Sequence, residues 1–153
     1  MVQNPPEHFP RLSPYLYYRD AGAAIDFLTS AFGFEERFVM RDPEGNVGHA
    51  EGVLEDAVVM LGTPGPDYRN PKQLGGVTQG LYVYVDDVDK HFEVAQAAGA
   101  TIVSPPSDQF YGDRNYTAAD PEGHHWFFGQ HVRDVSEEEL HEGAAAAATE
   151  MNS

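Results

Sequence analysis

Residues 16–20, LYYRD, and residues 82–86, YVYVD, are two similar stretches of one chain, and they decide its fold. Aromatic and aliphatic side chains favour a β-strand in each stretch, and each ends in an aspartate that can cap a helix. Each leads into an amphipathic segment that ends at a glycine, Gly33 in the first case and Gly99 in the second. At an offset of 66 residues both the aspartates and the glycines coincide. The pattern therefore predicts a duplicated βα unit.

Both halves of the chain continue with the same order of elements. Helices are expected at 21–32 and 88–98, where apolar residues recur every three or four positions, with Asp20 and Asp87 as N-caps. The expected strands are 13–19, 34–41, 47–54, 57–61, 81–85, 101–103, 114–119 and 125–130. Because the order βαβββ occurs twice, the predicted fold class is α+β, with paired βαβββ modules that form a cup-shaped mixed sheet.

Composition divides the chain into five segments. They are an N-terminal extension (1–11), a first module (12–61), a linker (62–79), a second module (80–131) and an acidic, alanine-rich C-terminal tail (132–153). The linker is rich in glycine and proline and has no periodicity. The proline-rich segment 104–112 is expected to be a loop, and the tail is expected to form a short helix over 137–141 and then to fray.

The composition also limits the classes of function. The chain has 25 acidic side chains against nine lysines and arginines, a net charge of −16, and no cysteine. An acidic surface repels phosphates and anionic lipids, so we expect no nucleic-acid and no membrane partner, and it favours a cationic ligand. The lack of cysteine excludes thiolate metal sites and thiol nucleophiles. No secretory signal or membrane-spanning run is recognised, so the expected location is the cytoplasm.

Several short motifs give the sequence a family resemblance. They are residues 20–27 (DAGAAIDF), 31–34 (AFGF), 85–89 (VDDVD) and 120–124 (DPEGH). With the doubled βαβββ order, they resemble the vicinal oxygen chelate superfamily, which includes glyoxalase I, bleomycin-resistance proteins and extradiol dioxygenases. Residues 48–51 (GHAE), 111–114 (YGDR) and 123–126 (GHHW) look closest to its PhnB-like branch. The resemblance implies a homodimer, with the modules paired within one chain or exchanged between two.

In the enzymes of that superfamily, side chains from four strands hold a divalent metal. The resemblance places those positions on Ser13, Met60, Gly80 and Phe127. Glycine and phenylalanine have no donor atom, and methionine is too soft a ligand for these metals, so we expect no cofactor. The alternative is a displaced metal site formed by His49, Glu51 and His125, a set that would suit zinc or iron.

Strand alternation predicts the lining of the cup. With the metal-equivalent positions taken as inward, the lining is Tyr15, Tyr17, Val58, Met60, Tyr82, Tyr84, His125 and Phe127. The opposite parity, which includes Trp126, then packs beneath the helices. The inward set suits a flat, partly apolar ligand, unless these side chains simply fill a closed core. Arg114 either reaches over the mouth of the cup to an anionic group or pairs locally with Asp113 or Asp120.

Three functions remain open at this stage. The first is binding of a small aromatic or cationic molecule in a metal-free cup, as in sequestration by bleomycin-resistance proteins. The second is a lyase, isomerase or dioxygenase with a displaced metal site. The third is a dimerising interaction module whose cup is filled by its own side chains. The aromatic lining and the altered metal positions favour the first.

Overall fold

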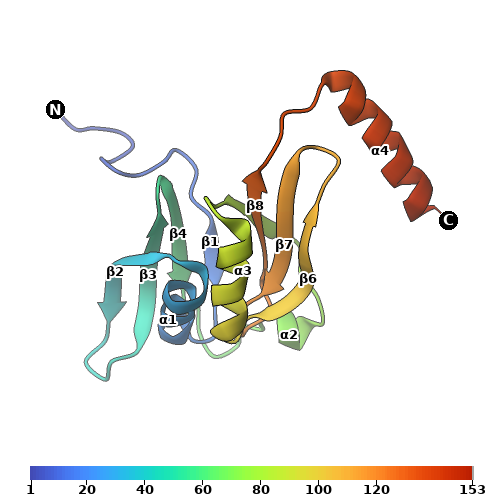
Figure 1. The fold of residues 1–153 in the computed structure, drawn as a ribbon. Helices are drawn as coiled ribbons and strands as arrows, with labels where there is room; N and C mark the ends of the chain where they lie inside the picture. The colour runs from blue at the N-terminus through green and yellow to red at the C-terminus, as the bar shows by residue number, and fades with distance from the viewer. Residues whose placement is uncertain (153) are drawn as a thin grey trace.

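The computed structural model describes residues 1–152, in which it contains two four-stranded sheets and four helices (Figure 1). The strands are β1 (Tyr15–Tyr17), β2 (Glu35–Arg41), β3 (Val47–Leu54), β4 (Ala57–Gly62), β5 (Gly80–Tyr84), β6 (Thr101–Asp108), β7 (Asp113–Ala119) and β8 (His125–His131). The helices are α1 (Ala21–Phe32), α2 (Pro71–Leu74), α3 (Val88–Ala97) and α4 (Glu137–Met151). None of these helices is long and apolar enough to cross a membrane. Ser153, the last residue of the predicted tail, lies outside the described residues.

The two sheets have the same topology. The strand order is β1-β4-β3-β2 in the first sheet and β5-β8-β7-β6 in the second. In each module the first and last strands pair in parallel, and the other neighbours pair antiparallel. The duplication and the α+β fold class are thereby confirmed.

The offset between the modules is 67 residues along the strands, which corrects the predicted 66. Tyr15 pairs with Met60 in the first module, and Tyr82 pairs with Phe127 at the corresponding place in the second. The aspartate N-caps of α1 and α3 are also 67 residues apart. The helix-stop glycines coincide at 66 only because the second helix is shorter. A shift of one residue matters here, since it exchanges the two faces of a strand.

Helices α1 and α3 both begin at the predicted caps. The side chain of Asp20 accepts a hydrogen bond from the amide of Ala23, and the side chain of Asp87 accepts one from the amide of Lys90. Each cap satisfies an amide that has no partner within the first turn. At the other end of α1, Gly33 adopts a φ of 81°, a left-handed conformation that glycine enters without strain.

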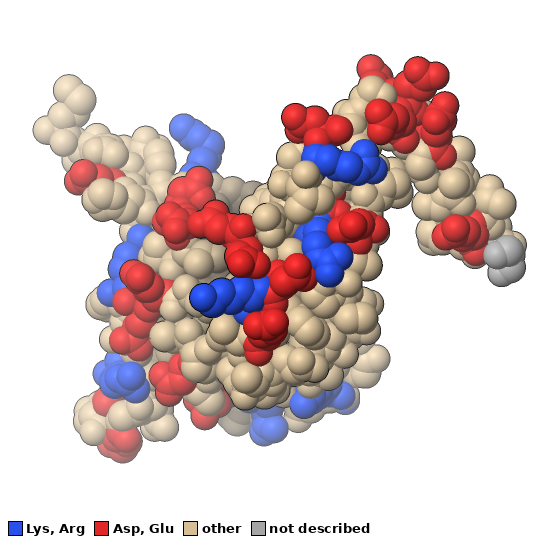
Figure 2. Space-filling model, viewed as in Figure 1, with Lys and Arg blue, Asp and Glu red and all other residues tan. Residues whose placement is uncertain are grey.

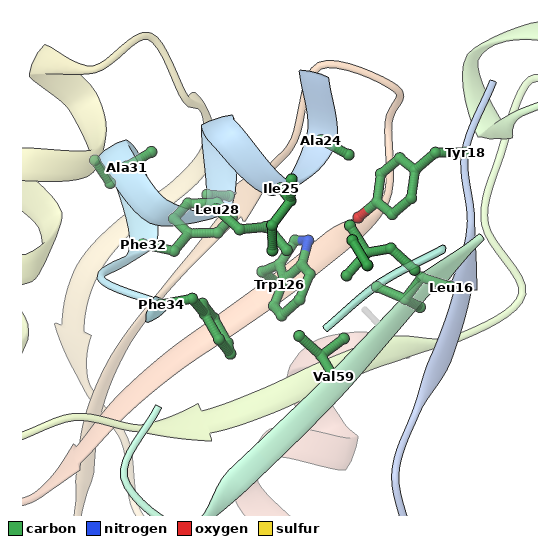
Figure 3. Close-up of a cluster of buried hydrophobic side chains, with 14 of the residues drawn as sticks. Leu16, Tyr18, Ala24, Ile25, Leu28, Ala31, Phe32, Phe34, Val59 and Trp126 are labelled. Carbon is green, nitrogen blue, oxygen red and sulfur yellow. The ribbon is translucent and has the colours of Figure 1, made fainter. Parts of the chain in front are cut away.

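Helices α1 and α3 lie between the sheets and share one core with both of them (Figure 1). Phe32 of α1 lies 5.6 Å from Trp126 and 4.7 Å from Phe128, measured between ring centroids, although both partners belong to the other module. Trp126 is 1% exposed, which confirms that it is a core residue beneath the helices (Figure 3). The helix-bearing faces of both sheets therefore point toward one common core.

Strand β6 is longer than predicted and runs through two prolines. Its range includes Pro105 and Pro106, which the sequence assigned to a loop. The strand lies at the edge of its sheet, where a missing N–H on the outer side costs no ladder bond. The pairing with β7 shifts register between Ser104 and Ser107, so an irregularity accommodates the prolines.

Two helical segments also differ from the prediction. The linker contains the short helix α2, which begins at an Asn70 cap. The tail helix α4 begins at the predicted Ser136 cap but continues to Met151 instead of fraying after the first turns. Alanine has the highest helix propensity, and Gly143 lies against the ring of Phe110 with no room for a Cβ. These two features explain the added length.

Candidate functional site

Four tyrosines on the edge strands β1 and β5 form the centre of the candidate site. Tyr15, Tyr17, Tyr82 and Tyr84 are 42–61% exposed, whereas their alternate neighbours on the same strands are buried or half-buried. Pleating directs the tyrosines to the face of each sheet opposite the helices. We call these surfaces the first and second tyrosine faces.

The two tyrosine faces point away from each other within one chain. The opposite face of each sheet packs on the shared core, so the tyrosine-bearing faces lie on the outside. Strand parity correctly placed the four tyrosines on the faces away from the core, but the expected single cup lined by both modules is not formed by one chain. Val58, another predicted lining residue, is only 4% exposed.

A glycine lies beneath one tyrosine of each module. Tyr15 crosses over Gly62, where an added Cβ would come within 2.8 Å of the tyrosine hydroxyl. Tyr82 crosses over Gly129, where the corresponding distance is 2.5 Å. Both glycines occupy the same register position, next to the second tyrosine of their edge strand. The missing side chains let each ring lie flat across the neighbouring strand, so that its hydroxyl reaches the third strand.

On the first tyrosine face, that hydroxyl meets a chain of polar groups. The Tyr15 hydroxyl lies 2.9 Å from Nδ1 of His49, and Nε2 of the same imidazole lies 3.0 Å from Oε2 of Glu51. The other carboxylate oxygen of Glu51 accepts hydrogen bonds from Nε and an Nη atom of Arg37 at 3.3 and 3.0 Å. Partial burial raises the pKa of Glu51, but the His49 and Arg37 hydrogen bonds outweigh it, and the pKa lies below its ordinary value.

On the second tyrosine face, the hydroxyls converge on Asp113 instead. Tyr82 and Tyr84 both donate to its Oδ2 at 2.8 Å, and His131 Nδ1 lies 2.8 Å from its Oδ1. Asn115 donates to the Tyr82 hydroxyl at 3.0 Å. Burial and the bonds to Asp113 raise the pKa of Tyr82, so its hydroxyl stays protonated. The sequence named Asp113 only as a possible partner of Arg114 and did not predict this role.

The Asp113–His131 pair predicts a pH dependence of stability. Burial opposes ionisation of Asp113, but hydrogen bonds from His131 and two tyrosines outweigh it and lower its pKa. Hydrogen bonds to Asp113 and Asp134 raise the pKa of His131. The contribution of the Asp113 carboxylate to stability is fully present above the ordinary aspartate pKa. It is lost as the pH falls through the lowered pKa of Asp113. The imidazole contribution is present below the ordinary histidine pKa and is lost as the pH rises through the raised value. The pair should therefore stabilise the fold most between these two ranges.

Melting temperatures of the wild type and His131→Gln across this pH range test the prediction. The difference between the two proteins should be largest in the mildly acidic range and should shrink on either side. His141→Gln is the matched control, because His141 is an exposed helix residue 3.6 Å from Glu137. A constant difference between wild type and His131→Gln at every pH would contradict the prediction.

The other predicted site residues fall in several places. Met60, His125 and Phe127 are half-buried on the tyrosine faces, and Phe127 stacks on Tyr82 at 6.2 Å with an interplanar angle of 11°. Arg114 does not belong to the site: its Nε bonds to Asp89 of α3 at 2.9 Å and an Nη atom to Asp108 at 3.2 Å. It therefore pairs neither with Asp113 nor with Asp120. Strand alternation places its neighbour Asp113 on the opposite, tyrosine-bearing face.

The displaced metal site is not formed by the described residues. His49 and Glu51 are hydrogen-bonded to each other, but His125 lies in the other sheet. No group of three or more His, Cys, Asp or Glu within residues 1–152 is arranged to hold a metal ion. At the family's usual positions, the Phe127 ring occupies the space next to Gly80, where an added Cβ would lie 2.5 Å from it. Within one chain, the donor atoms present therefore do not fit the metal of the related enzymes.

A hollow of about 240 Å³ adjoins the first tyrosine face. Its walls are Tyr15 and Tyr17 of β1 and, across from them, linker residues that include Tyr68 and Leu74. The Tyr68 hydroxyl donates to the main-chain oxygen of Tyr17 at 2.8 Å and so fixes the linker beside β1. A larger hollow of about 870 Å³, lined by Phe9, Arg37 and several acids, lies at the far edge of the first sheet, away from the tyrosines.

Comparisons with known proteins agree with this architecture. The sequence model of the Glyoxalase/Bleomycin resistance protein/Dioxygenase superfamily matches residues 8–128. An uncharacterized protein of Mycobacterium tuberculosis is 40% identical over 136 residues, which cover 86% of this chain and 80% of that protein. The crystal structure of TioX from Micromonospora sp. ML1 is similar with a TM-score of 0.67 and 34% identity, covering 80% of this chain and 99% of TioX. A superfamily member from Sphaerobacter thermophilus follows with a TM-score of 0.61, 27% identity and coverage of 77% and 94%.

Proposed function

Since this chain belongs to the glyoxalase/bleomycin resistance protein/dioxygenase superfamily, we propose that it binds a small aromatic molecule without a metal, as a sequestering protein does. One observation carries the proposal. Both sheets hold pairs of exposed tyrosines on the face where related enzymes hold a metal, and two of the metal-equivalent positions, Met60 and Phe127, are apolar here. Rings held in this way stack on a flat ligand with little loss of conformational entropy.

Charge gives a second argument about the ligand. Acidic side chains outnumber basic ones by 16, and Figure 2 shows them distributed over the helix side of the molecule and gathered at the start of α4. A field of this sign repels anions and attracts cations. We therefore expect a ligand that is neutral or cationic as it approaches, and a cationic ring would gain further from the tyrosine faces. The PhnB-like branch and a cytoplasmic location remain predictions from the sequence.

The proposed binding unit is a homodimer. One chain exposes its two tyrosine faces on opposite sides, so neither face is covered by the other. Large apolar side chains also remain exposed on the two sheets, among them Phe38, Met40 and Val103. In the proposed dimer, each cup takes one module from each chain. The first tyrosine face of one chain would then lie opposite the second tyrosine face of its partner. This arrangement would complete the cup and cover these side chains.

Ligand binding is tested by a thermal-shift screen of small aromatic molecules of positive, neutral and negative charge. Neutral and cationic aromatics should raise the melting temperature, and Tyr82→Ala together with Tyr15→Ala should reduce their affinity by about tenfold or more, as expected for lost aromatic contacts. Met151→Ala, at an exposed apolar residue near the end of α4, serves as a control for side-chain loss. Failure of every aromatic compound to stabilise the wild type would contradict the proposal.

Charge reversal on the tyrosine faces tests the dimer. The double variant Tyr17→Glu/Tyr84→Glu should be monomeric at concentrations at which the wild type is a dimer, because carboxylates would be buried in the closed cup and one would lie beside Asp113. Met151→Glu, at an exposed apolar residue near the end of α4, should stay dimeric. Light scattering coupled to gel filtration measures both. A monomeric wild type, or a dimer that tolerates the double variant, would contradict the arrangement.

A further inference from the structure

The polar chain on the first tyrosine face has the form of a proton relay. Three strands supply its members in a line: Tyr15 from β1, His49 and Glu51 from β3, and Arg37 from β2. The line runs from an exposed hydroxyl to a carboxylate that is 13% exposed. None of these groups is required by the core, since all lie on the face opposite the helices.

The hydrogen bonds of the relay determine the tautomer of His49. Glu51 is held ionised by Arg37 and can only accept, so the Nε2 atom of His49 must carry the proton of their 3.0 Å hydrogen bond. In a neutral imidazole the other nitrogen, Nδ1, then has a free lone pair. The Tyr15 hydroxyl, 2.9 Å away, donates to it. Glu51 thus orients a basic nitrogen toward the exposed tyrosine, as a carboxylate does behind the histidine of a hydrolase triad.

The second module lacks this relay at the equivalent place. Tyr82 has the same position as Tyr15, but Asn115 stands where the first module has His49. An amide cannot take up a proton, and Asp113, which accepts the Tyr82 hydrogen bond, is a weak base because its pKa is lowered. Imidazole is the stronger base near neutral pH. The duplication has therefore kept the tyrosine twice and placed a base behind it once.

We propose that Tyr15, His49 and Glu51 act as a general-base relay on a neutral aromatic ligand that carries an acidic hydroxyl, which deepens the binding function proposed above and rests on it. The ligand hydroxyl gives its proton to the Tyr15 oxygen while the Tyr15 proton passes to Nδ1 of His49. The O–H bonds of the ligand and of Tyr15 are broken, and a new O–H bond at Tyr15 and an N–H bond at the imidazole are formed. The ligand becomes an anion beside an imidazolium that Glu51 stabilises.

This step reconciles an acidic protein with an anionic bound ligand. The ligand approaches as a neutral molecule, so the surface charge does not repel it. Ionisation takes place only at the site, and the total charge of the complex does not change. The groups that face the imidazole are the Tyr15 hydroxyl, the Glu51 carboxylate and, behind it, the Arg37 guanidinium. An opposite charge within a few ångströms favours the ionised form of a hydroxyl, and raises its ionisation constant by about tenfold or more.

The first arm of the test examines the free protein by nitrogen-15 NMR of its imidazoles. At neutral pH, His49 should show a protonated Nε2 and an unprotonated Nδ1. Glu51→Gln should weaken this preference, whereas His141→Gln, a change in an exposed histidine–glutamate pair of α4, should leave the His49 signals unchanged. A protonated Nδ1 in the wild type would overturn the relay without any reference to ligands.

The second arm uses para-nitrophenol, whose neutral and ionised forms differ in colour. Below its own pKa the wild type should bind it in the coloured, ionised form, with an ionisation constant raised about tenfold or more over that in solution. The variants Tyr15→Phe and His49→Gln should bind it in the neutral form. Tyr15 is 46% exposed, so its replacement by phenylalanine should not disturb the fold. Binding without ionisation to the wild type would overturn the relay and leave the binding function standing. No binding of para-nitrophenol would overturn the ligand class proposed for the relay, while the wider aromatic screen would still decide the binding function.

Discussion

Replacing Asp120 by alanine is expected to lower the free energy of unfolding by about 3–5 kcal/mol, because two buried donors would each lose their acceptor. The carboxyl group is 2% exposed and lies where the two modules meet. Its Oδ2 accepts from the Tyr18 hydroxyl of the first module at 2.7 Å and from the indole N–H of Trp126 at 3.1 Å. A stranded buried donor costs about 1–3 kcal/mol, and Asp120 serves two of them through one oxygen.

The other oxygen of Asp120 shapes the turn between β7 and β8, which contacts the first module. It accepts from the backbone amides of Glu122 and His124 at 3.1 and 3.0 Å. In this conformation the turn places the Glu122 carboxylate just before α1. There it accepts hydrogen bonds from the amides of Arg19 and Asp20 at 2.7 and 3.0 Å. Loss of Asp120 therefore loosens both the core contact and the turn that holds the end of β1.

The chain contains its own control for this prediction. Asp42 begins the other Asp-Pro-Glu-Gly turn and makes similar local hydrogen bonds to Glu44 and Asn46, but it is exposed and contacts only its own hairpin. Asp42→Ala should lower the free energy of unfolding far less than Asp120→Ala does, because Asp42 is an exposed turn residue. Urea denaturation of both variants measures the difference. Equal losses would show that Asp120 acts only through its turn and does not couple the modules.

Local features of the fold were predictable from the sequence. The caps Asp20 and Asp87 and the glycine stop after α1 depend on residues within one turn of each other, and all three are in place. The face on which each strand residue lies was also predictable, because side chains alternate between the two faces and apolar ones mark the buried face. Trp126 was therefore placed correctly in the core before any contact was known.

Features that depend on contacts distant in sequence were not predictable. The offset of 66 came from aligning Gly33 with Gly99, which coincide at 66 only because the two helices differ in length. Arg114 was paired with its sequence neighbours, whereas its partner Asp89 lies 25 residues away on α3. The outward direction of both tyrosine faces follows from packing between modules, chiefly Phe32 against β8. That contact could not be read from either repeat alone.

Replacing Trp126 by alanine should also cost about 3–5 kcal/mol, the usual range for removal of a buried large aromatic side chain. The indole is 1% exposed and lies between residues of the first module, with ring-centroid distances of 5.6 Å to Phe32 and 5.6 Å to Phe34 (Figure 3). It is thus a large apolar contact of the second sheet with the first module. Alanine would leave a cavity between β8 and the first module. The remaining contacts of α1 and α3 would then have to hold the two modules together.

Urea denaturation, followed by circular dichroism, measures the effect of Trp126→Ala, since this variant lacks the only tryptophan of the sequence. Trp126→Phe is the matched variant, because it keeps a ring in the core but gives up the hydrogen bond to Asp120, and it should cost clearly less than alanine. If Trp126 couples the modules, Trp126→Ala should also weaken binding of aromatic ligands, although it lies on the face opposite the tyrosines, because the two faces would no longer keep a fixed relation. A loss below about 1 kcal/mol would contradict the role of Trp126, and unchanged ligand affinity in a strongly destabilised variant would show that each tyrosine face binds independently of the other.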